Sequence, residues 1–260
     1  MKRNSWTFEE TTVALGLYFQ MPFGKIRHEN PETIRVAKLL GRSPSSLTMK
    51  VGNLARFDPT MKAKGISGLV NGAKMEGEVW AKYANQLDVL SEDYNALLKK
   101  LSEGKKDEKS PFVSDEEVLD LPPGLDKEHL AKYRVNQTFF RHAVLSAYGN
   151  ACCITGIDDT RLLTASHIKP WAKCTTGAER TTPANGLCLN ALHDKAFDRG
   201  LITLDDEGCV ILSSSLKDAL TASMYEEFFV RYEGKKIAPP KHHAPLEEFL
   251  AYHREHIFVA

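Results

Sequence analysis

The chain has 260 residues, which is long enough for about two domains. Hydrophobic residues make up 42% and charged residues 26%, a balance typical of a soluble globular protein, and no apolar run approaches the roughly 20 residues needed to span a bilayer. The first residues lack the apolar core of a secretory signal, so we expect a cytoplasmic protein without a membrane partner.

The five cysteines exclude a simple disulfide framework, because their number is odd and Cys152 and Cys153 are adjacent. They also do not form two Cys-x-x-Cys pairs, and a structural zinc requires a closed set of such ligands. We therefore expect no structural zinc.

The net charge of zero hides an uneven distribution. Residues 1–75 contain twelve Lys and Arg against five Asp and Glu, a net +7, whereas residues 102–130 contain four against nine, a net −5. A basic segment indicates a polyanionic partner, and the alternative is a solvated basic face.

Cap residues predict three helices in the basic segment. The first starts after Ser5 or Thr7, the second follows the cap Asn30 and the third follows the cap Ser43. A tight turn with Gly41 joins the second and third helices, which is typical of a helix-turn-helix, and residues 6–10 are similar to the start of Myb-type modules.

In a helix-turn-helix the second of the two helices enters the major groove of double-stranded DNA. Here that helix is polar and basic on its outer side, and the alternative use is a small bundle for packing or dimerisation. The candidate DNA contacts in this part are Arg42, Ser45, Lys50, Asn53 and Arg56.

An apolar stripe predicts one helix over residues 76–101, and the polar, acidic residues that follow predict a flexible connection. We therefore expect a helical DNA-binding domain over 1–101, an acidic flexible linker over 102–127 and a second domain over 128–260. In the second domain we expect a helix over 136–147, a strand and turn over 151–156, a strand ending at His167, a hairpin over 201–212 and a closing helix over 245–258.

Four motifs follow one another in the second domain: Cys-x-Thr-Gly from Cys153, Ser-His-Ile-Lys-Pro-Trp from Ser166, Asn-Gly-Leu-x-Leu from Asn185 and His-x-x-x-Phe-Asp-Arg-Gly from His193. This set resembles one branch of the His-Asn-His (HNH) nucleases, without the zinc clip of many members, over residues 137–213. The resemblance implies a ββα-metal domain that grips one divalent metal ion. The whole chain is then of the α+β class.

The resemblance also implies roles for the motif residues. His167 is the general base that takes a proton from water, because a neutral imidazole can do so near neutral pH. Asn185 holds the His167 imidazole in position, through nearby backbone or through the ring itself. His193 is the metal ligand, and the expected metal is Mg²⁺ or Mn²⁺.

One position departs from the family pattern. Many HNH enzymes place Asp or His just before the base as a second metal ligand, and this chain has Ser166 there. Asp198 is the candidate substitute, and its alternative role is a cap or salt bridge beside Arg199. The remaining candidate contacts to DNA phosphates are Lys169, Lys195 and Arg199.

These expectations combine into a metal-dependent DNA endonuclease of restriction type, which acts on all DNA or on modified DNA alone. A homodimer is one route to a double-strand cut, because one active site cuts one strand. The alternatives are a DNA-binding regulator with an inactive HNH module, which Ser166 favours, and a phage or toxin nuclease.

Overall fold

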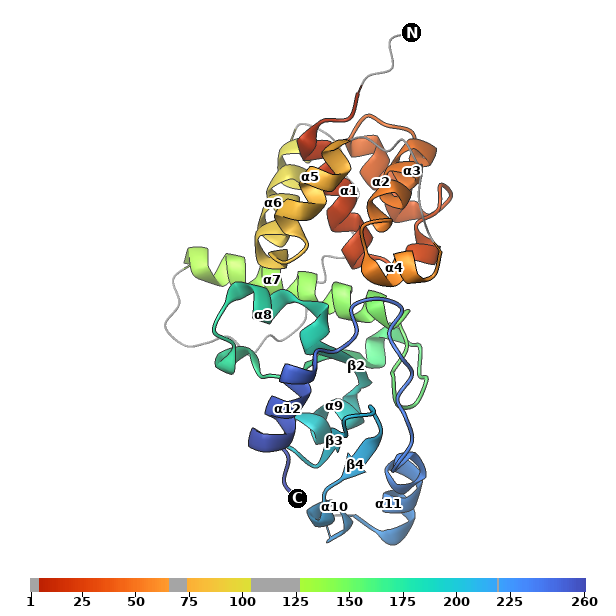
Figure 1. Ribbon diagram of the computed structural model, residues 1–260, viewed down its shortest axis with the longest axis vertical. Coiled ribbons are helices and arrows are strands. Elements are labelled where there is room, and N and C mark those ends of the chain that lie inside the picture. Colours follow the sequence, from red (N-terminus) through yellow and green to blue (C-terminus); the bar gives the residue numbers. More distant parts are fainter. Residues whose placement is uncertain (1–4, 66–73, 104–126, 219) are drawn as a thin grey trace. The chain divides into compact units, whose positions relative to one another are not determined.

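The structure is a computed structural model that describes residues 5–65, 74–103, 127–218 and 220–260. The chain divides into two compact units, Met1–Ser146 and Ala147–Ala260, and each is described by itself (Figure 1). The predicted linker over 102–127 lies almost wholly outside the described residues. No helix in the described ranges is long and apolar enough to cross a membrane.

The first unit is built of helices. Their N-terminal ends follow the caps that the sequence predicts: Thr7 and Glu10 form a capping box, with Glu10 N donating to Thr7 Oγ1 at 3.1 Å, and Asn30 and Ser43 cap the next two helices. The helices are α1 (Phe8–Gln20), α2 (Pro31–Leu39), α3 (Pro44–Ala55), α4 (Pro59–Ala63), α5 (Lys74–Tyr83), α6 (Leu87–Ser102) and α7 (Lys127–Ala147), whose last residue belongs to the second unit.

Helix α1 is the centre of the first unit. Every residue from Thr11 to Gln20 is buried, and α1 packs against α3, α5 and α6 (Figure 1). A Cβ at Gly16 would lie 2.2 Å from the Tyr94 ring, so the close approach of α6 to α1 requires glycine there. A helix that is buried on all sides fixes the positions of the helices around it.

The single helix predicted over 76–101 is wrong, because the chain breaks between Tyr83 and Leu87 into α5 and α6. Both residues are buried, so the apolar stripe continues across the break. Periodicity alone did not show that two shorter helices pack separately against α1.

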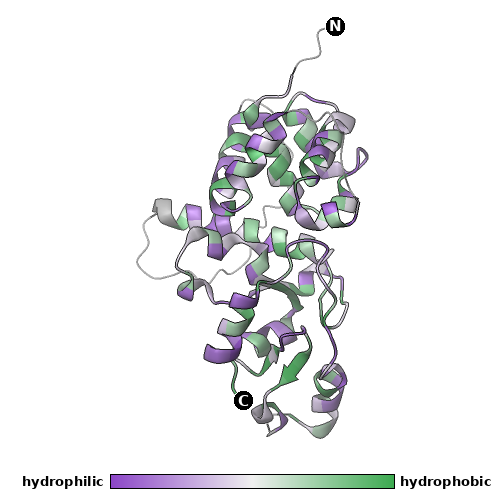
Figure 2. Cartoon of the chain, viewed as in Figure 1, coloured by the Kyte–Doolittle hydropathy of each residue, from purple (hydrophilic) through white to green (hydrophobic). Residues whose placement is uncertain are grey.

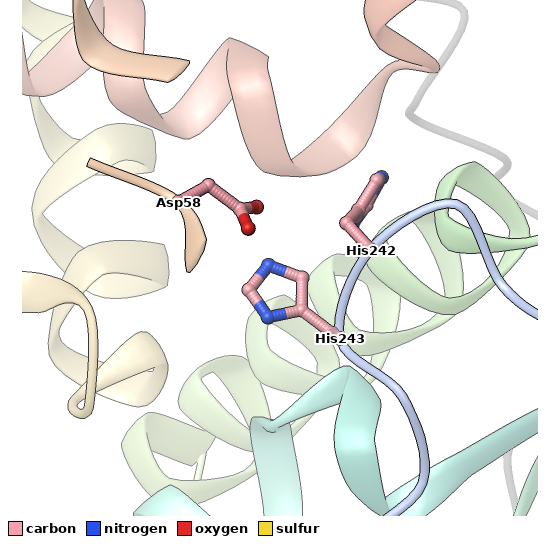
Figure 3. A group of neighbouring side chains, drawn as sticks. All are labelled: Asp58, His242 and His243. Atoms are coloured by element: carbon pink, nitrogen blue, oxygen red, sulfur yellow. The ribbon is translucent and has the colours of Figure 1, made fainter. Parts of the chain in front are cut away.

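The buried carboxylate of Asp58 lies between the end of α3 and the start of α4. Asp58, whose side chain is drawn in Figure 3, caps α4 by accepting a hydrogen bond from Thr60 N at 2.8 Å. It accepts a second hydrogen bond from the Tyr18 hydroxyl at 2.6 Å. Burial raises the pKa of Tyr18 far above its ordinary value, and the Asp58 carboxylate adds to that shift. The pair therefore ties α4 to α1.

The second unit contains two small antiparallel sheets and several helices. Strand β1 pairs with β2, and β3 pairs with β4 across the predicted hairpin. The elements are β1 (Leu163–His167), α8 (Gly177–Thr181), β2 (Gly186–Asn190), α9 (Ala191–Asp198), β3 (Ile202–Leu204), β4 (Val210–Leu212), α10 (Ser214–Asp218), α11 (Ala222–Phe228) and α12 (Glu247–His256).

The strands of the β3–β4 hairpin are hydrophobic (Figure 2), and β3 is wholly buried. The strand predicted over 151–156 is wrong: this segment is a turn, in which Cys153 N donates to the Cys188 carbonyl of β2 at 2.8 Å. A single backbone bond of this kind anchors the segment without extending the sheet.

Two further features of the second unit are a glycine at the end of α9 and a pair of histidines before α12. Gly200 ends α9 with φ +69, and a Cβ there would lie 2.0 Å from the Ile257 carbonyl oxygen. His242 and His243 stand in the loop before α12, with their rings edge to face and their centroids 5.0 Å apart (Figure 3). The predicted closing helix is present as α12.

Candidate active site

The predicted motif residues lie on β1, in the turn just before β2 and on the helix that follows β2. In the β1–β2 register His167 is opposite Gly186, and Leu163 is opposite Asn190. Asn190 ends β2 and caps α9, because its Oδ1 accepts hydrogen bonds from Leu192 N and His193 N at 3.0 Å each. The chain therefore turns from strand to helix at Asn190, and α9 packs back over both strands.

The His167 ring is held at the end of β1. Its Nε2–H donates to the Arg180 carbonyl oxygen at 3.0 Å, and the Trp171 ring meets it edge-on with centroids 5.6 Å apart. Burial lowers the pKa of His167 to about 4, although the bond to Arg180 acts in the opposite direction. The imidazole is therefore neutral near pH 7, with its proton on Nε2 and its lone pair on Nδ1.

Asn185 is fully buried and acts on the backbone around His167. Its Oδ1 accepts from Lys169 N at 2.8 Å, and its Nδ2 donates to the carbonyl oxygens of Lys169 and Glu179 at 3.1 and 3.0 Å. The backbone of Asn185 adds a bond from Ile168 N at 3.0 Å. Of the two routes considered for positioning His167, the structure contains the backbone route.

Ser166 and Asp198 come together between β1 and α9. The Ser166 hydroxyl is buried, and its Oγ has no hydrogen-bond partner in the described part of the chain. Asp198 is near enough for this hydroxyl to lower its pKa, but burial and the Asp194 carboxylate act more strongly and raise it to about 6.

A comparison with protein families matches the segment that contains these strands and this helix. Residues 152–205 match the HNH endonuclease family. The C-terminal part of the chain thus contains an HNH domain, and the match covers β1, β2 and α9 together with the first residues after them. A comparison with curated proteins found no match.

The HNH match indicates a nuclease of this type, whose substrate is DNA and whose cofactor is a divalent metal ion. Against that expectation, the predicted metal ligand His193 is engaged at both ring nitrogens. Asn190 Nδ2 donates to His193 Nδ1 at 2.8 Å, and His193 Nε2–H donates to the Phe228 carbonyl at 2.9 Å. The ring also packs against Phe229 and Tyr232, and burial lowers its pKa. Its contacts in the described residues do not include His167.

The three cations predicted to contact DNA from the HNH domain differ in their surroundings. Lys169 is paired with Glu179 at 2.8 Å, which lowers the pKa of Glu179 to about 2. Lys195 and Arg199 are exposed on α9 and at its end, beside Asp198. Lys195 and Arg199 therefore remain accessible to a phosphate, whereas Lys169 must first exchange its carboxylate partner.

Two of the cations predicted to contact DNA from the first unit are paired with carboxylates of the same unit. Lys50 is buried and its Nζ lies 2.7 Å from Glu76 Oε1. Arg42 lies over the Trp6 ring, and its Nη2 is 2.7 Å from Glu10 Oε2. To contact DNA, either cation would first have to leave its carboxylate partner.

The other three predicted contacts of the first unit are more accessible. Ser45 is exposed, and Asn53 and Arg56 are half-buried. Met49, which is 58% exposed, stands on the same helix. The accessible side of α3 is therefore made of small polar side chains with one thioether.

Sequence reasoning missed Arg180, which supplies the carbonyl that fixes His167. It also missed Glu179 and Cys174, whose carbonyl and Sγ complete the bonds of Asn185. These residues lie between the motifs, where neither spacing nor periodicity distinguishes them, and only the folded loop brings them to the site.

Proposed function

We propose that this chain is a divalent-metal-dependent endonuclease that hydrolyses phosphodiester bonds of double-stranded DNA. The observation that carries the proposal is the His167 imidazole, which is neutral, fixed in one tautomer by Arg180 and placed at the end of β1 in an HNH domain. A neutral imidazole of fixed tautomer is what a general base requires.

His167 is the proposed general base. Its Nδ1 takes a proton from a water molecule, whose oxygen then attacks the phosphorus while the 3′ oxygen leaves. The products carry a 5′-phosphate and a 3′-hydroxyl. Nε2 keeps its proton throughout, because it donates to the Arg180 carbonyl oxygen, which can only accept a hydrogen bond.

Asn185 is the proposed positioning residue. Its side chain joins the backbone on either side of the loop that leaves His167 and returns through Glu179. Since the same loop supplies the Arg180 carbonyl, the amide of Asn185 fixes the direction in which the His167 ring points.

The oxygen atoms of Ser166 and Asp198 fit a hard divalent cation. A buried hydroxyl without a hydrogen-bond partner beside a carboxylate is an oxygen donor pair, and Mg²⁺ prefers oxygen ligands and retains several waters. Mn²⁺ accepts the same donors. When bound, the metal neutralises phosphate charge and stabilises the leaving oxygen. His193 joins this set only if one of its two hydrogen bonds opens.

The accessible face of α3 is the proposed DNA-reading surface of the first unit, through Ser45, Asn53 and Arg56. An asparagine amide can read adenine and an arginine can contact guanine or phosphate. A separate DNA-reading unit suits a restriction enzyme, including one specific for modified bases. A double-strand cut then needs a homodimer or two binding events.

Nicking of supercoiled plasmid tests this function. The protein is incubated with modified and unmodified plasmid in Mg²⁺ or Mn²⁺, with EDTA as the control, and the ends are sequenced. Metal-dependent nicks with 5′-phosphate ends are expected, and nicks that persist in EDTA would contradict the proposal.

A DNA-binding regulator with an inactive HNH domain is the second candidate. The engagement of both His193 nitrogens and the hydroxyl at Ser166 favour it, because each weakens the metal site. A regulator binds the plasmid but leaves it supercoiled under every metal condition, so the same assay separates the two functions.

A further inference from the structure

The guanidinium of Arg180 and the imidazole of His167 both lie against the Trp171 ring. The Arg180 CZ atom lies 5.8 Å from the centre of the Trp171 ring, and that ring meets the His167 ring at 5.6 Å. The backbone of Arg180 already holds His167 through its carbonyl oxygen. One residue therefore brings both a fixed acceptor and a positive charge to the same end of β1.

Among the residues that the structure describes, the charge of Arg180 has no anionic partner. Nη2 donates to the Cys174 carbonyl at 3.1 Å, while Nε is buried and makes no hydrogen bond to any described residue. The adjacent carboxylate of Glu179 is paired with Lys169 at 2.8 Å, and no ion pair of Arg180 occurs in the described ranges. An unpaired buried N–H of a charged group costs free energy, so its retention needs a reason.

The neighbouring arginine Arg161 shows the contrast within the same unit. Arg161 precedes β1 and is neutralised by Asp159, to which it donates through both Nε and Nη2. Its partner is local and lies two residues away. Arg180 has a carboxylate as its immediate neighbour and is nevertheless left without one.

A phosphodiester would supply the anionic hydrogen-bond acceptor that Arg180 lacks among the described residues. Its anionic oxygens accept hydrogen bonds from the planar fork of a guanidinium, and the group must sit next to the base for water to be activated toward phosphorus. A purely structural arginine would need only the bond to Cys174, which leaves both the buried Nε and the net charge unexplained.

We propose that the Arg180 guanidinium binds a non-bridging oxygen of the DNA phosphate on which His167 acts. This inference rests on the proposed nuclease function, because it takes the substrate to be a phosphodiester. Arg180 is then a substrate-binding residue that the motifs of the chain do not include.

Salt dependence of DNA binding tests the contact without any cleavage. The full-length protein is titrated into a labelled duplex in EDTA at several NaCl concentrations, as wild type, Arg180→Gln, Arg180→Lys and Arg161→Gln. Loss of one phosphate contact lowers the slope of log K against log salt by about 0.9. Arg180→Gln should show that decrease, whereas Arg180→Lys and Arg161→Gln should keep the wild-type slope.

Cleavage provides the second measurement. With divalent metal, Arg180→Gln should lower kcat/KM by about 10- to 100-fold, the range for a lost hydrogen bond to a charged group, at an unchanged Tm. An unchanged slope in Arg180→Gln, or an equal decrease in Arg161→Gln, overturns the proposal, as does a wild-type protein that does not bind DNA. Wild-type protein that binds DNA but never cuts it contradicts the nuclease function. In that case the slope of log K against log salt still tests the Arg180 contact.

Discussion

The side chain of Asn185 binds both backbone groups of Lys169, accepting from its N–H at 2.8 Å and donating to its carbonyl at 3.1 Å. Lys169 lies two residues after His167, so the amide fixes the strand exit on which the candidate base stands. The same Nδ2 reaches the Glu179 carbonyl at 3.0 Å and thereby closes the loop over the imidazole.

We expect Asn185→Ala to lower both stability and cleavage. The substitution leaves buried N–H and carbonyl groups without partners, at a cost of about 1–3 kcal/mol for each group. The free energy of unfolding, measured in urea, should fall by at least about 3 kcal/mol, because three such backbone groups lose their partner. Asn95→Ala is the matched control, because Asn95 is exposed and donates a single bond to Ser91. Equal losses in the two variants would contradict the bridging role of Asn185.

We expect Lys50→Met to destabilise the first unit without weakening DNA binding. Removal of the ammonium leaves Glu76, which is 1% exposed, as an unpaired buried charge, at a cost of about 3–5 kcal/mol. The double variant Lys50→Met with Glu76→Leu should regain most of this loss. Thermal unfolding and DNA titration measure the two effects, with the exposed Lys38→Met as the control. A stable Lys50→Met protein that no longer binds DNA would restore Lys50 as a DNA contact.

We expect metal affinity to depend on Asp198 more than on His193. Asp198→Asn removes the charged oxygen donor beside Ser166, so the Kd for Mn²⁺ measured by calorimetry should rise about 10- to 100-fold, as for loss of an interaction with a charged group. His193→Gln should change that Kd by less than about threefold, because both ring nitrogens are already bonded within the protein. The reverse order of effects would show that the His193 bonds open to admit metal.

We expect stability to decrease in acid through His253. This ring stacks on Phe197 at 3.7 Å, accepts from the Thr203 hydroxyl and donates to the Phe197 carbonyl, and burial lowers its pKa from 6.5 to about 4. The unfolded chain therefore takes up the proton first, so stability present above pH 6.5 is lost as pH falls toward 4 and changes little below it.

The size of this effect is at most about 3.5 kcal/mol, from about 1.4 kcal/mol for each pH unit between 6.5 and 4. Urea unfolding at a series of pH values should show a smaller decrease in His253→Gln than in wild type. His256→Gln, an exposed histidine of the same helix, is the control and should match wild type. Because the pKa values of His167 and His193 are also lowered, some decrease remains in every variant.

Local signals predicted much of the fold. The caps at Thr7, Asn30 and Ser43 mark the starts of α1, α2 and α3, and the Asp206–Gly208 turn joins β3 to β4. These features depend on residues a few positions apart. The break between α5 and α6 was missed because the apolar stripe continues across it and only tertiary packing on α1 separates the two helices.

The candidate site was predictable only in its motif residues. His167 and Asn185 were recognised because the motifs that contain them resemble those of HNH nucleases, whereas Arg180 lies between the motifs in a segment whose sequence has no distinguishing pattern. Lys50 was taken for a surface cation because its partner Glu76 is 26 residues away. Ion pairs between residues far apart in the sequence, such as Lys50 and Glu76, are therefore a feature that the sequence alone did not predict.

The central claim is that the His167 imidazole activates water for phosphodiester hydrolysis. The most direct measurement compares the rate of plasmid nicking by wild type and His167→Ala in saturating Mn²⁺, with DNA binding measured alongside. We predict that His167→Ala binds DNA as wild type does and nicks it about 100- to 10,000-fold more slowly, the usual contribution of a general base. Equal nicking by both proteins would contradict the account.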